Sequence, residues 1–565
     1  MAVTETAVTE TAVTEAAVTE AAVTEAAVIE AAVAEAASGK ATAGLTVVQD
    51  ASAARAAHEG ILRRQSARES AARTYARALP IVPVRARGLT IEGADGRRYL
   101  DCLSGAGTLA LGHNHPVVLE AIRKVLDSGA PLHALDLATP VKDAFITELF
   151  RTLPPGLAGH ARVQFCGPAG TDAVEAAFKL VRAATGRSEL LAFAGAYHGM
   201  TSGALEASGH ASDVRVARLP YPQDYRCPFG VGGPQGAELA ARWTESVLDD
   251  PKSGVPLPAG MILEPVQGEG GVLPAPDDWM RRMRQITADR SIPLIADEVQ
   301  TGVGRTGAFW AVEHSGITPD VMVLSKAIGG SLPLAVVVYR DDLDVWEPGA
   351  HAGTFRGNQL AMAAGTATMA YVRENALTER AAALGARMLN QLRLLAEEFS
   401  VIGDVRGRGL MIGVEMVEPV EMVDSEGWGV GAGPGRGGGV RAGGVDECGE
   451  GAGGCGGGSR AGGGAGSPVS GASGAGGVGS LRPRLPRPAS PALAAAVQRE
   501  CLRRGLIVEL GGRHSSVVRL LPPLTITDEQ ATAVLDRLAD AVAAVARNHV
   551  PGSGRQQQGR RRSGG

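Results

Sequence analysis

A lysine and an aspartate at the ends of two short apolar runs are the first candidates for chemistry. Lys326 follows VMVLS and precedes AIGG, and Asp297 follows LIA, 29 residues earlier. Burying an unpaired ammonium costs several kcal/mol, so Lys326 must reach solvent, pair with an anion, or react as a neutral or covalently bound amine. Because a strand-end lysine that reaches solvent is the ordinary outcome, the neighbouring motifs must decide.

A third motif, CGPAGTDAVEAAFKL, places small residues between an apolar run and a helical pattern. Gly167 and Gly170 let backbone N–H groups approach an anion, and a helix that begins near Thr171 adds about half a positive charge at its N-terminus. No GK[ST] follows, so this is not a Walker A loop. The motif predicts a phosphate site, although Thr171 alone could equally be a helix N-cap.

The amine, the carboxylate, the phosphate loop and the pair Tyr197–His198 together suit one cofactor, pyridoxal phosphate. Its aldehyde needs a lysine with which to form an imine, its pyridine nitrogen needs a carboxylate to stay protonated, and its phosphate needs oriented amides. Its ring needs an apolar or aromatic face. The combination therefore predicts a pyridoxal-phosphate enzyme.

A different cofactor is suggested by Gly302, Gly304 and Gly307, which spell GxGxxG, with Asp320 near the spacing of a ribose-binding acid. However, AFWAVEHSG follows without a convincing helix start, and the glycines come after the acidic strand end. We therefore interpret these glycines as shaping an ordered loop behind the site.

The elements that must position these side chains are apolar runs alternating with helical patterns between about residues 60 and 416. The runs are VQF, ELLAFAG, GMILEPV, PLIADEV, DVMVLSKA and LAVVVYR. Between two of them, TDAVEAAFKLVRAATG has one apolar face and ends at Gly186, a suitable cap. This alternation predicts a mainly parallel sheet covered on both faces, which binds ligands at the carboxyl ends of its strands.

Three segments fall outside this pattern, and we predict that they are disordered. Residues 2–36 are seven copies of a five-residue unit, a glycine-rich tract interrupts the C-terminal part, and the end RQQQGRRRSGG is basic. The boundaries assigned to them are 1–58 for the leader, 417–487 for the insertion and 549–565 for the tail.

The motifs LIADEVQTGVGRTG, PDVMVLSKAIGG and GTFRGNQLAMAAG together resemble those of the class III (fold type I) pyridoxal-phosphate aminotransferases, over roughly residues 75–416 and 488–546. The resemblance implies an α/β fold with a mainly parallel seven-stranded sheet in a large domain, and a small α+β domain made from the N- and C-terminal segments. The implied parts are 59–110 (small domain), 111–345 (large cofactor-binding domain), 346–416 (linking helix and start of the C-terminal small domain) and 488–548 (its remainder).

The resemblance also implies roles for individual residues. Lys326 becomes the Schiff-base lysine, and Asp297 pairs with the pyridinium. The residues implied to bind the cofactor are Gly170, Thr171 (phosphate), Tyr197 (ring stacking), His198 (close to the ring), Gln300 (near the phenolic oxygen) and Thr354 (phosphate of the neighbouring subunit). The last role makes the active unit a homodimer with shared active sites.

Two further positions concern the substrate. Glu264 in ILEPVQGEGG and Arg519 in VVRLLPPLTIT lie in motifs that form a switch in relatives. An ω-amine donor brings no carboxylate beside its reacting carbon, so an exposed arginine there would be unpaired, whereas glutamate or 2-oxoglutarate brings a carboxylate that must be held. The hypothesis is that Glu264 covers Arg519 in one half-reaction and releases it in the other, although an edge-strand arginine and a structural glutamate are simpler alternatives.

Within the family, DCLSGAGTLALGHNHPVVLEAI, QFCGPAGTDAVEAA, GAYHGMTSGALEASG and YRCPFG resemble the diaminobutyrate–2-oxoglutarate branch. The implied reaction is ping-pong transamination between L-2,4-diaminobutyrate plus 2-oxoglutarate and L-aspartate 4-semialdehyde plus L-glutamate. The alternatives are another class III ω-aminotransferase, using 4-aminobutyrate, ornithine or acetylornithine, and a non-catalytic scaffold of the same fold.

Composition limits the class of protein and the cellular environment that the sequence suggests. With 565 residues, 45% of them hydrophobic, the chain can bury a large core, and a net charge of −5 gives no general attraction to nucleic acid or anionic membranes. No apolar stretch reaches the ~18–20 residues of a membrane span, and no signal peptide is evident. Six scattered cysteines and no zinc-ligand spacing predict reduced thiols, no metal site and a cytoplasmic enzyme.

Overall fold

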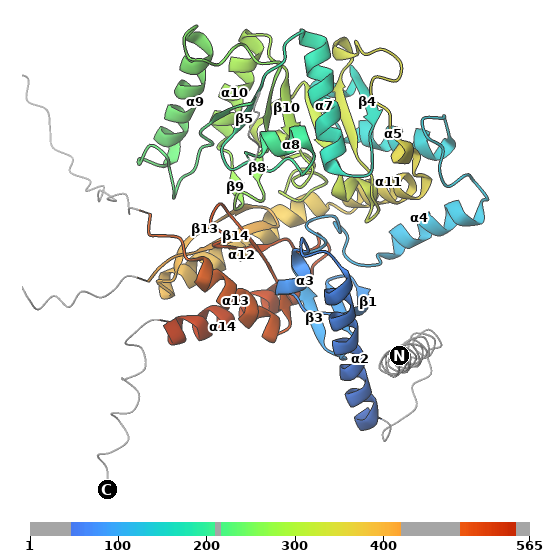
Figure 1. The fold of residues 1–565 in the computed structure, drawn as a ribbon, viewed down its shortest axis with the longest axis vertical. Helices are drawn as coiled ribbons and strands as arrows, with labels where there is room; N and C mark the ends of the chain where they lie inside the picture. The colour runs from blue at the N-terminus through green and yellow to red at the C-terminus, as the bar shows by residue number, and fades with distance from the viewer. Residues whose placement is uncertain (1–46, 210–215, 420–485, 550–565) are drawn as a thin grey trace, which may run out of the picture. The chain divides into compact units, whose positions relative to one another are not determined.

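The computed structural model describes residues 47–209, 216–419 and 486–549, and its largest sheet has seven strands. Three of them, β4, β5 and β10, are labelled in Figure 1. The strand order is β4 (Ala161–Phe165), β12 (Val336–Arg340), β11 (Val321–Leu324), β10 (Leu294–Asp297), β7 (Gly260–Leu263), β5 (Leu190–Phe193) and β6 (Val216–Leu219). Among these strands, β12 alone runs in the direction opposite to the other six. The prediction of a mainly parallel seven-stranded sheet is confirmed.

Helices cover both faces of this sheet, because successive side chains of each strand point to opposite sides. Ile295 of β10 joins the core cluster of Phe178 on α7 (Gly170–Thr185), whereas Leu294 joins the cluster of Met283 on α10 (Asp277–Asp289). Helix α7 ends at Gly186, whose φ of 68° is left-handed, as the sequence predicts.

Other helices surround the sheet and form the C-terminal part. They are α4 (Pro116–Asp127), α5 (Pro140–Thr152), α6 (Pro155–Ala158), α8 (Ser202–Ala207), α9 (Gly233–Asp249), α11 (Gln359–Glu374), α12 (Leu377–Glu398), α13 (Pro491–Arg503) and α14 (Asp528–His549). Short 3-10 turns follow several strands, namely η1 (Ala311–Ser315), η2 (Lys326–Gly329), η3 (Asp341–Leu343) and η4 (Thr354–Gly357). In keeping with the loop interpretation, the glycines of GxGxxG precede η1 and lie in turns.

Two four-stranded sheets combine distant parts of the chain. One has the order β1 (Pro83–Arg87), β2 (Thr90–Gly93), β3 (Arg98–Asp101) and β15 (Leu506–Ile507); the other has β13 (Ile402–Arg408), β14 (Met411–Met416), β17 (Val517–Leu520) and β16 (Glu509–Gly511). The pairing of β3 with β15 joins N- and C-terminal segments, as the small domain requires. The domain boundaries at residues 110 and 345 stay predictions.

The predicted leader and insertion differ from the described chain at their edges. Helix α2 spans Val47–Arg68, so residues 47–58 are helical rather than part of a disordered leader; this stretch is rich in alanine, the best helix former. Val417 pairs with Ala489 in an isolated bridge, so both ends of the inserted segment meet. The repeats, most of the glycine-rich tract and the basic tail lie outside the described residues.

Candidate active site

A cavity of about 250 Å³ lies at the carboxyl ends of β10 and β11. The predicted site residues that line it are Gly170, Thr171, Tyr197, His198, Glu264, Asp297, Gln300 and Lys326. Thr354 and Arg519 are not among the lining residues. Parallel strands bring their carboxyl ends to one edge, which explains why residues from five separate motifs converge here.

Lys326 stands at the start of η2, directly after β11, with a left-handed φ of 51°. A non-glycine residue adopts this conformation only where its surroundings hold it, and such strain concentrates at functional sites. Burial lowers the pKa of the Lys326 amine; nearby Glu269 opposes this shift, and Arg519 adds to it. Within the described ranges no carboxylate lies within 4 Å of this amine, so its surroundings favour the neutral form that accepts a proton.

Asp297 is held by a buried histidine. Its Oδ2 lies 2.7 Å from His198 Nδ1, and its Oδ1 accepts the Val299 N–H at 3.1 Å. Burial lowers the pKa of His198, but the hydrogen bond to Asp297 and the negative charges of Asp297 and Glu264 together outweigh that effect, so the pKa is raised overall. The resemblance implies that His198 lies close to the cofactor ring; the structure adds that this histidine orients the Asp297 carboxylate.

The N-terminus of α7 lines one end of the cavity, through Ala169, Gly170 and Thr171. A Cβ on Gly170 would lie 3.1 Å from Val299 Cγ1, so the loop backbone closely approaches the strand-end residues. Thr171 is not the N-cap: that position is Ala169, whose N–H donates to Asp172 at 3.0 Å. Instead, Thr171 Oγ1 lies 2.6 Å from the hydroxyl oxygen of Thr201.

The remaining lining residues fit a flat, polar ring. Gln300 Nε2 donates to Ala106 O at 3.1 Å, while its buried Oε1 has no partner in the described part of the chain. Such an orphaned acceptor suits a hydroxyl group, and Tyr197, 40% exposed, offers an aromatic face. Amine, carboxylate, orphaned acceptor and helix N-terminus thus fit pyridoxal phosphate.

The acid that covers Arg519 is Glu269, so the predicted partner Glu264 is wrong. Both Glu269 oxygens lie close to Arg519 Nη2, at 2.9 and 2.8 Å. Glu264 instead accepts the backbone N–H groups of Tyr197 (2.9 Å) and Gly268 (3.0 Å), and burial raises its pKa to about 7. Glu264 directly follows β7, whereas Glu269 sits on the turn between β8 (Val266–Gln267) and β9 (Leu273–Pro274).

Two site residues have no sequence motif that signals them. Glu509 lies 2.7 Å from Arg519 Nη2, and the Tyr75 hydroxyl donates to Glu509 Oε1 at 2.7 Å. Tyr75 belongs to the short helix α3 (Tyr75–Ala78), so this contact joins the two ends of the chain. The sequence does carry a signal for Glu269 as the partner of Arg519. Glycines on both sides of an acidic residue indicate a backbone that can approach another element closely.

Known proteins resemble this chain over most of its length. A family model described as aminotransferase class-III matches residues 71–432. A diaminobutyrate–2-oxoglutarate aminotransferase from Rhizobium meliloti is 48% identical, over 88% of this chain and 94% of its own. The protein of the same name from Haemophilus influenzae is 40% identical, over 88% and 98%.

Solved structures agree with the fold. An (S)-enantioselective ω-transaminase from Thermomicrobium roseum is 25% identical with a TM-score of 0.66, covering 86% of this chain and 98% of that one. An amine transaminase from an uncultivated Pseudomonas species, solved with pyridoxal phosphate bound, is 27% identical with a TM-score of 0.64, over 86% and 98%. The chain belongs to the aminotransferase class-III family and is a pyridoxal-phosphate-dependent enzyme.

Proposed function

We propose that this enzyme interconverts L-2,4-diaminobutyrate plus 2-oxoglutarate with L-aspartate 4-semialdehyde plus L-glutamate, in two half-reactions. The observation that carries the proposal is a part-buried lysine at a cavity lined by Glu269, whose carboxylate covers the adjacent Arg519. The names of the Rhizobium and Haemophilus relatives support the choice of donor, since each aligns over nearly its whole length.

The residues that would hold the cofactor are Gly170 and Thr171 at its phosphate, Tyr197 on its ring, Asp297 at its pyridine nitrogen and Gln300 at its phenolic oxygen. When bound, pyridoxal phosphate supplies an aldehyde that condenses with amines and a protonated ring that accepts the electron pair released at the substrate carbon. His198 orients the Asp297 carboxylate through its 2.7 Å hydrogen bond. The carboxylate then keeps the proton on the ring nitrogen.

Lys326 is the proposed proton carrier. Desolvation lowers the pKa of its amine and favours the neutral form, which would take a proton at Nζ from the substrate carbon and release it again once the cofactor is bound. The amine is thus both the attachment point and the general base.

Glu269 and Arg519 are proposed to let one pocket serve both donors. Diaminobutyrate reacts at its ω-amine and has no carboxylate beside the reacting carbon, so Glu269 stays on Arg519. The α-carboxylate of glutamate takes the place of Glu269 and pairs with Arg519. The switch predicted from the sequence is thereby retained with a different acid.

A homodimer is proposed as the active unit. Thr354 does not line the cavity of its own chain, which agrees with a role at the phosphate of a partner. Large apolar side chains remain exposed in the same region of the sequence, including Phe355 (60% exposed), and on the loop that carries Leu135 and Leu137 (48% and 67%). Sedimentation of the purified protein tests this, and a stable monomer with full activity contradicts it.

The donor is tested by supplying purified enzyme and 2-oxoglutarate with diaminobutyrate, 4-aminobutyrate or ornithine. We expect kcat/KM for diaminobutyrate to exceed both others by at least about tenfold, a difference of roughly 1.4 kcal/mol. Preference for either of the others would identify a different class III ω-aminotransferase. A protein that stays colourless with added cofactor would instead support the scaffold alternative.

A further inference from the structure

Arg519 lies close to two carboxylates, those of Glu269 and Glu509. The proposed exchange of Glu269 for a substrate carboxylate leaves the role of Glu509 unexplained. The Arg519 side chain is fully buried, and Glu509 Oε2 lies 2.7 Å from the same Nη2 atom that Glu269 uses. One guanidinium therefore faces two carboxylates, and the formal charge of the three groups together is −1. We call these three residues the arginine cluster.

Within the arginine cluster, Glu509 is fixed. It stands directly opposite Arg519 in the neighbouring strands β16 and β17, where cross-strand side chains lie about 5 Å apart. Its side chain is 7% exposed, and the Tyr75 hydroxyl holds its other oxygen at 2.7 Å. A Cβ on Gly511 would lie 2.6 Å from Arg519 Nε, so the guanidinium also packs tightly against β16.

The Glu269 side chain, in contrast, is placed so that it can move away from Arg519. Its side chain is 34% exposed and lines the cavity, and Gly268 and Gly270 flank it. Its backbone stays anchored, because the Gly512 N–H donates to Glu269 O at 2.8 Å. The carboxylate can therefore rotate away from Arg519 while the turn stays in place.

From this difference we infer that Glu509 is a positioning residue, a permanent counter-ion that stays on Arg519 through both half-reactions. The inference rests on the proposed function. When the carboxylate of glutamate replaces that of Glu269, Arg519 again has two carboxylates, and the charge at this place is −1 before and after. A constant negative charge near Lys326 attracts the ammonium group that every amino donor brings, and Tyr75 acts by holding Glu509 in place.

The test is Glu509→Gln in the holoenzyme, with the two half-reactions followed separately by rapid mixing and the visible absorbance of the cofactor. We expect the apparent Kd for diaminobutyrate and for glutamate to rise by a similar factor, roughly 5- to 20-fold for one lost charge at this depth. The limiting rates should stay within about twofold. Glu269→Gln is the matched contrast, because it should change the two donors unequally.

Two results would overturn the inference. The first is a loss of affinity in Glu509→Gln confined to one donor; the second is a lower limiting rate at unchanged Kd, which would show that Glu509 only supports the strand.

Tyr75→Phe keeps both charges and removes only the hydroxyl, and we expect about a two- to threefold rise in Kd for both amines. Should Glu509→Gln fail to fold, unequal or unchanged affinities in Tyr75→Phe would contradict the inference. A wild type that accepts glutamate but not diaminobutyrate refutes the proposed donor, while the glutamate measurement still tests Glu509.

Discussion

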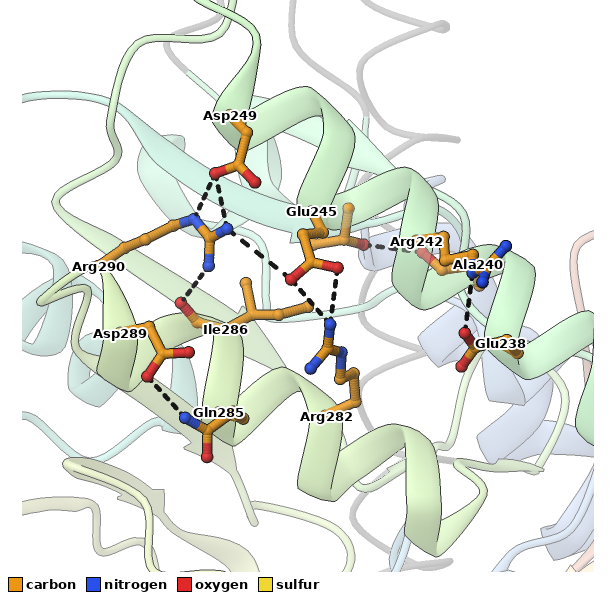
Figure 2. A network of polar contacts seen from close by, with 11 residues as sticks. Glu238, Ala240, Arg242, Glu245, Asp249, Arg282, Gln285, Ile286, Asp289 and Arg290 are labelled. Carbon is orange, nitrogen blue, oxygen red and sulfur yellow. Dashed lines mark hydrogen bonds and ion pairs between the residues drawn. The ribbon is translucent and has the colours of Figure 1, made fainter.

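Two groups of arginines and carboxylates in this chain use the same chemistry in opposite surroundings. Figure 2 shows the first, in which Arg282 of α10 donates to both oxygens of Glu245 on α9, at 2.8 and 2.7 Å. Arg290 follows α10 and donates to Asp249 at 2.9 and 2.6 Å. We call this the α9–α10 ion network; its side chains range from 18% to 56% exposed. The second group is the arginine cluster, where Arg519 is fully buried.

The difference between the two groups shows that exposure to solvent, more than contact geometry, decides how much free energy an ion pair contributes. An exposed pair contributes about 0.2–1 kcal/mol to stability, since water competes for both charges. Removing one partner of a buried pair costs about 3–5 kcal/mol, because the other charge is left uncompensated. The α9–α10 ion network joins two helices at the surface, whereas a buried arginine needs a partner, so the proposed exchange of that partner would be selective.

Lys326→Ala sharpens the comparison most, because this partly exposed amine forms no ion pair with a carboxylate in the described part of the chain. We expect turnover to fall by at least about 10³-fold, since both the covalent attachment and the general base are lost. The yellow colour of the purified protein should disappear as well. Lys124→Ala removes an exposed lysine of α4, 75% exposed, and should stay within about twofold of wild type. Comparable activity in both variants would contradict the assignment of Lys326.

Asp297→Asn removes the buried carboxylate at the other end of the cofactor site. We expect kcat to fall by about 10²–10³-fold, the usual effect of losing one preorganised electrostatic group. Asp320→Asn is the control, because Asp320 is equally buried but precedes β11 and pairs with Arg284 and Arg340. That variant should lose stability and keep its turnover per folded molecule. A loss of turnover as large in Asp320→Asn would show that burial alone explains the effect at Asp297.

Local pattern and fold topology explain why most of this site was predictable. Lys326 and Asp297 each end an apolar run, and the parallel sheet must bring such ends together, so spacing along the chain was sufficient. The phosphate loop was equally local, since a glycine-rich turn leads straight into α7. These residues needed no knowledge of long-range packing.

The arginine cluster was harder, because its members meet only through tertiary structure. Glu264 and Glu269 lie in one motif, and only the position of the turn between β8 and β9 decides which of them reaches Arg519. Glu509 and Tyr75 come from opposite ends of the chain and carry no pattern of their own. Contacts that depend on the docking of separate sheets leave no periodic trace in the sequence.

Glu264→Gln tests the cost of burying an acid that forms no ion pair with a lysine or arginine in the described part of the chain. Burial raises the pKa of Glu264 to about 7, from 4.5 in the unfolded chain. The folded state therefore binds the proton more tightly, and the contribution to stability is fully present below pH 4.5 and is lost as the pH rises to about 7. Relative to wild type, Glu264→Gln should gain up to about 3 kcal/mol between pH 5 and pH 8.

Urea unfolding at both pH values, with saturating cofactor, measures this change. The hydrogen bonds that glutamine cannot reproduce cost the same at each pH, so they cancel in the difference. A difference between variant and wild type that does not change with pH would contradict the raised pKa of Glu264.

Arg282→Met should have the smallest effect, and its salt dependence completes the contrast with the buried site. The guanidinium is 44% exposed and Glu245 is 30% exposed, so we expect their coupling in a double-mutant cycle with Glu245→Gln to be below about 1 kcal/mol. Because the Debye length falls from about 10 Å at 0.1 M salt to about 3 Å at 1 M, most of that coupling should vanish at 1 M sodium chloride. A coupling that survives at high salt would mean that α9 and α10 shield their ion pairs as the arginine cluster does, and the distinction between the two groups would rest on position in the fold alone.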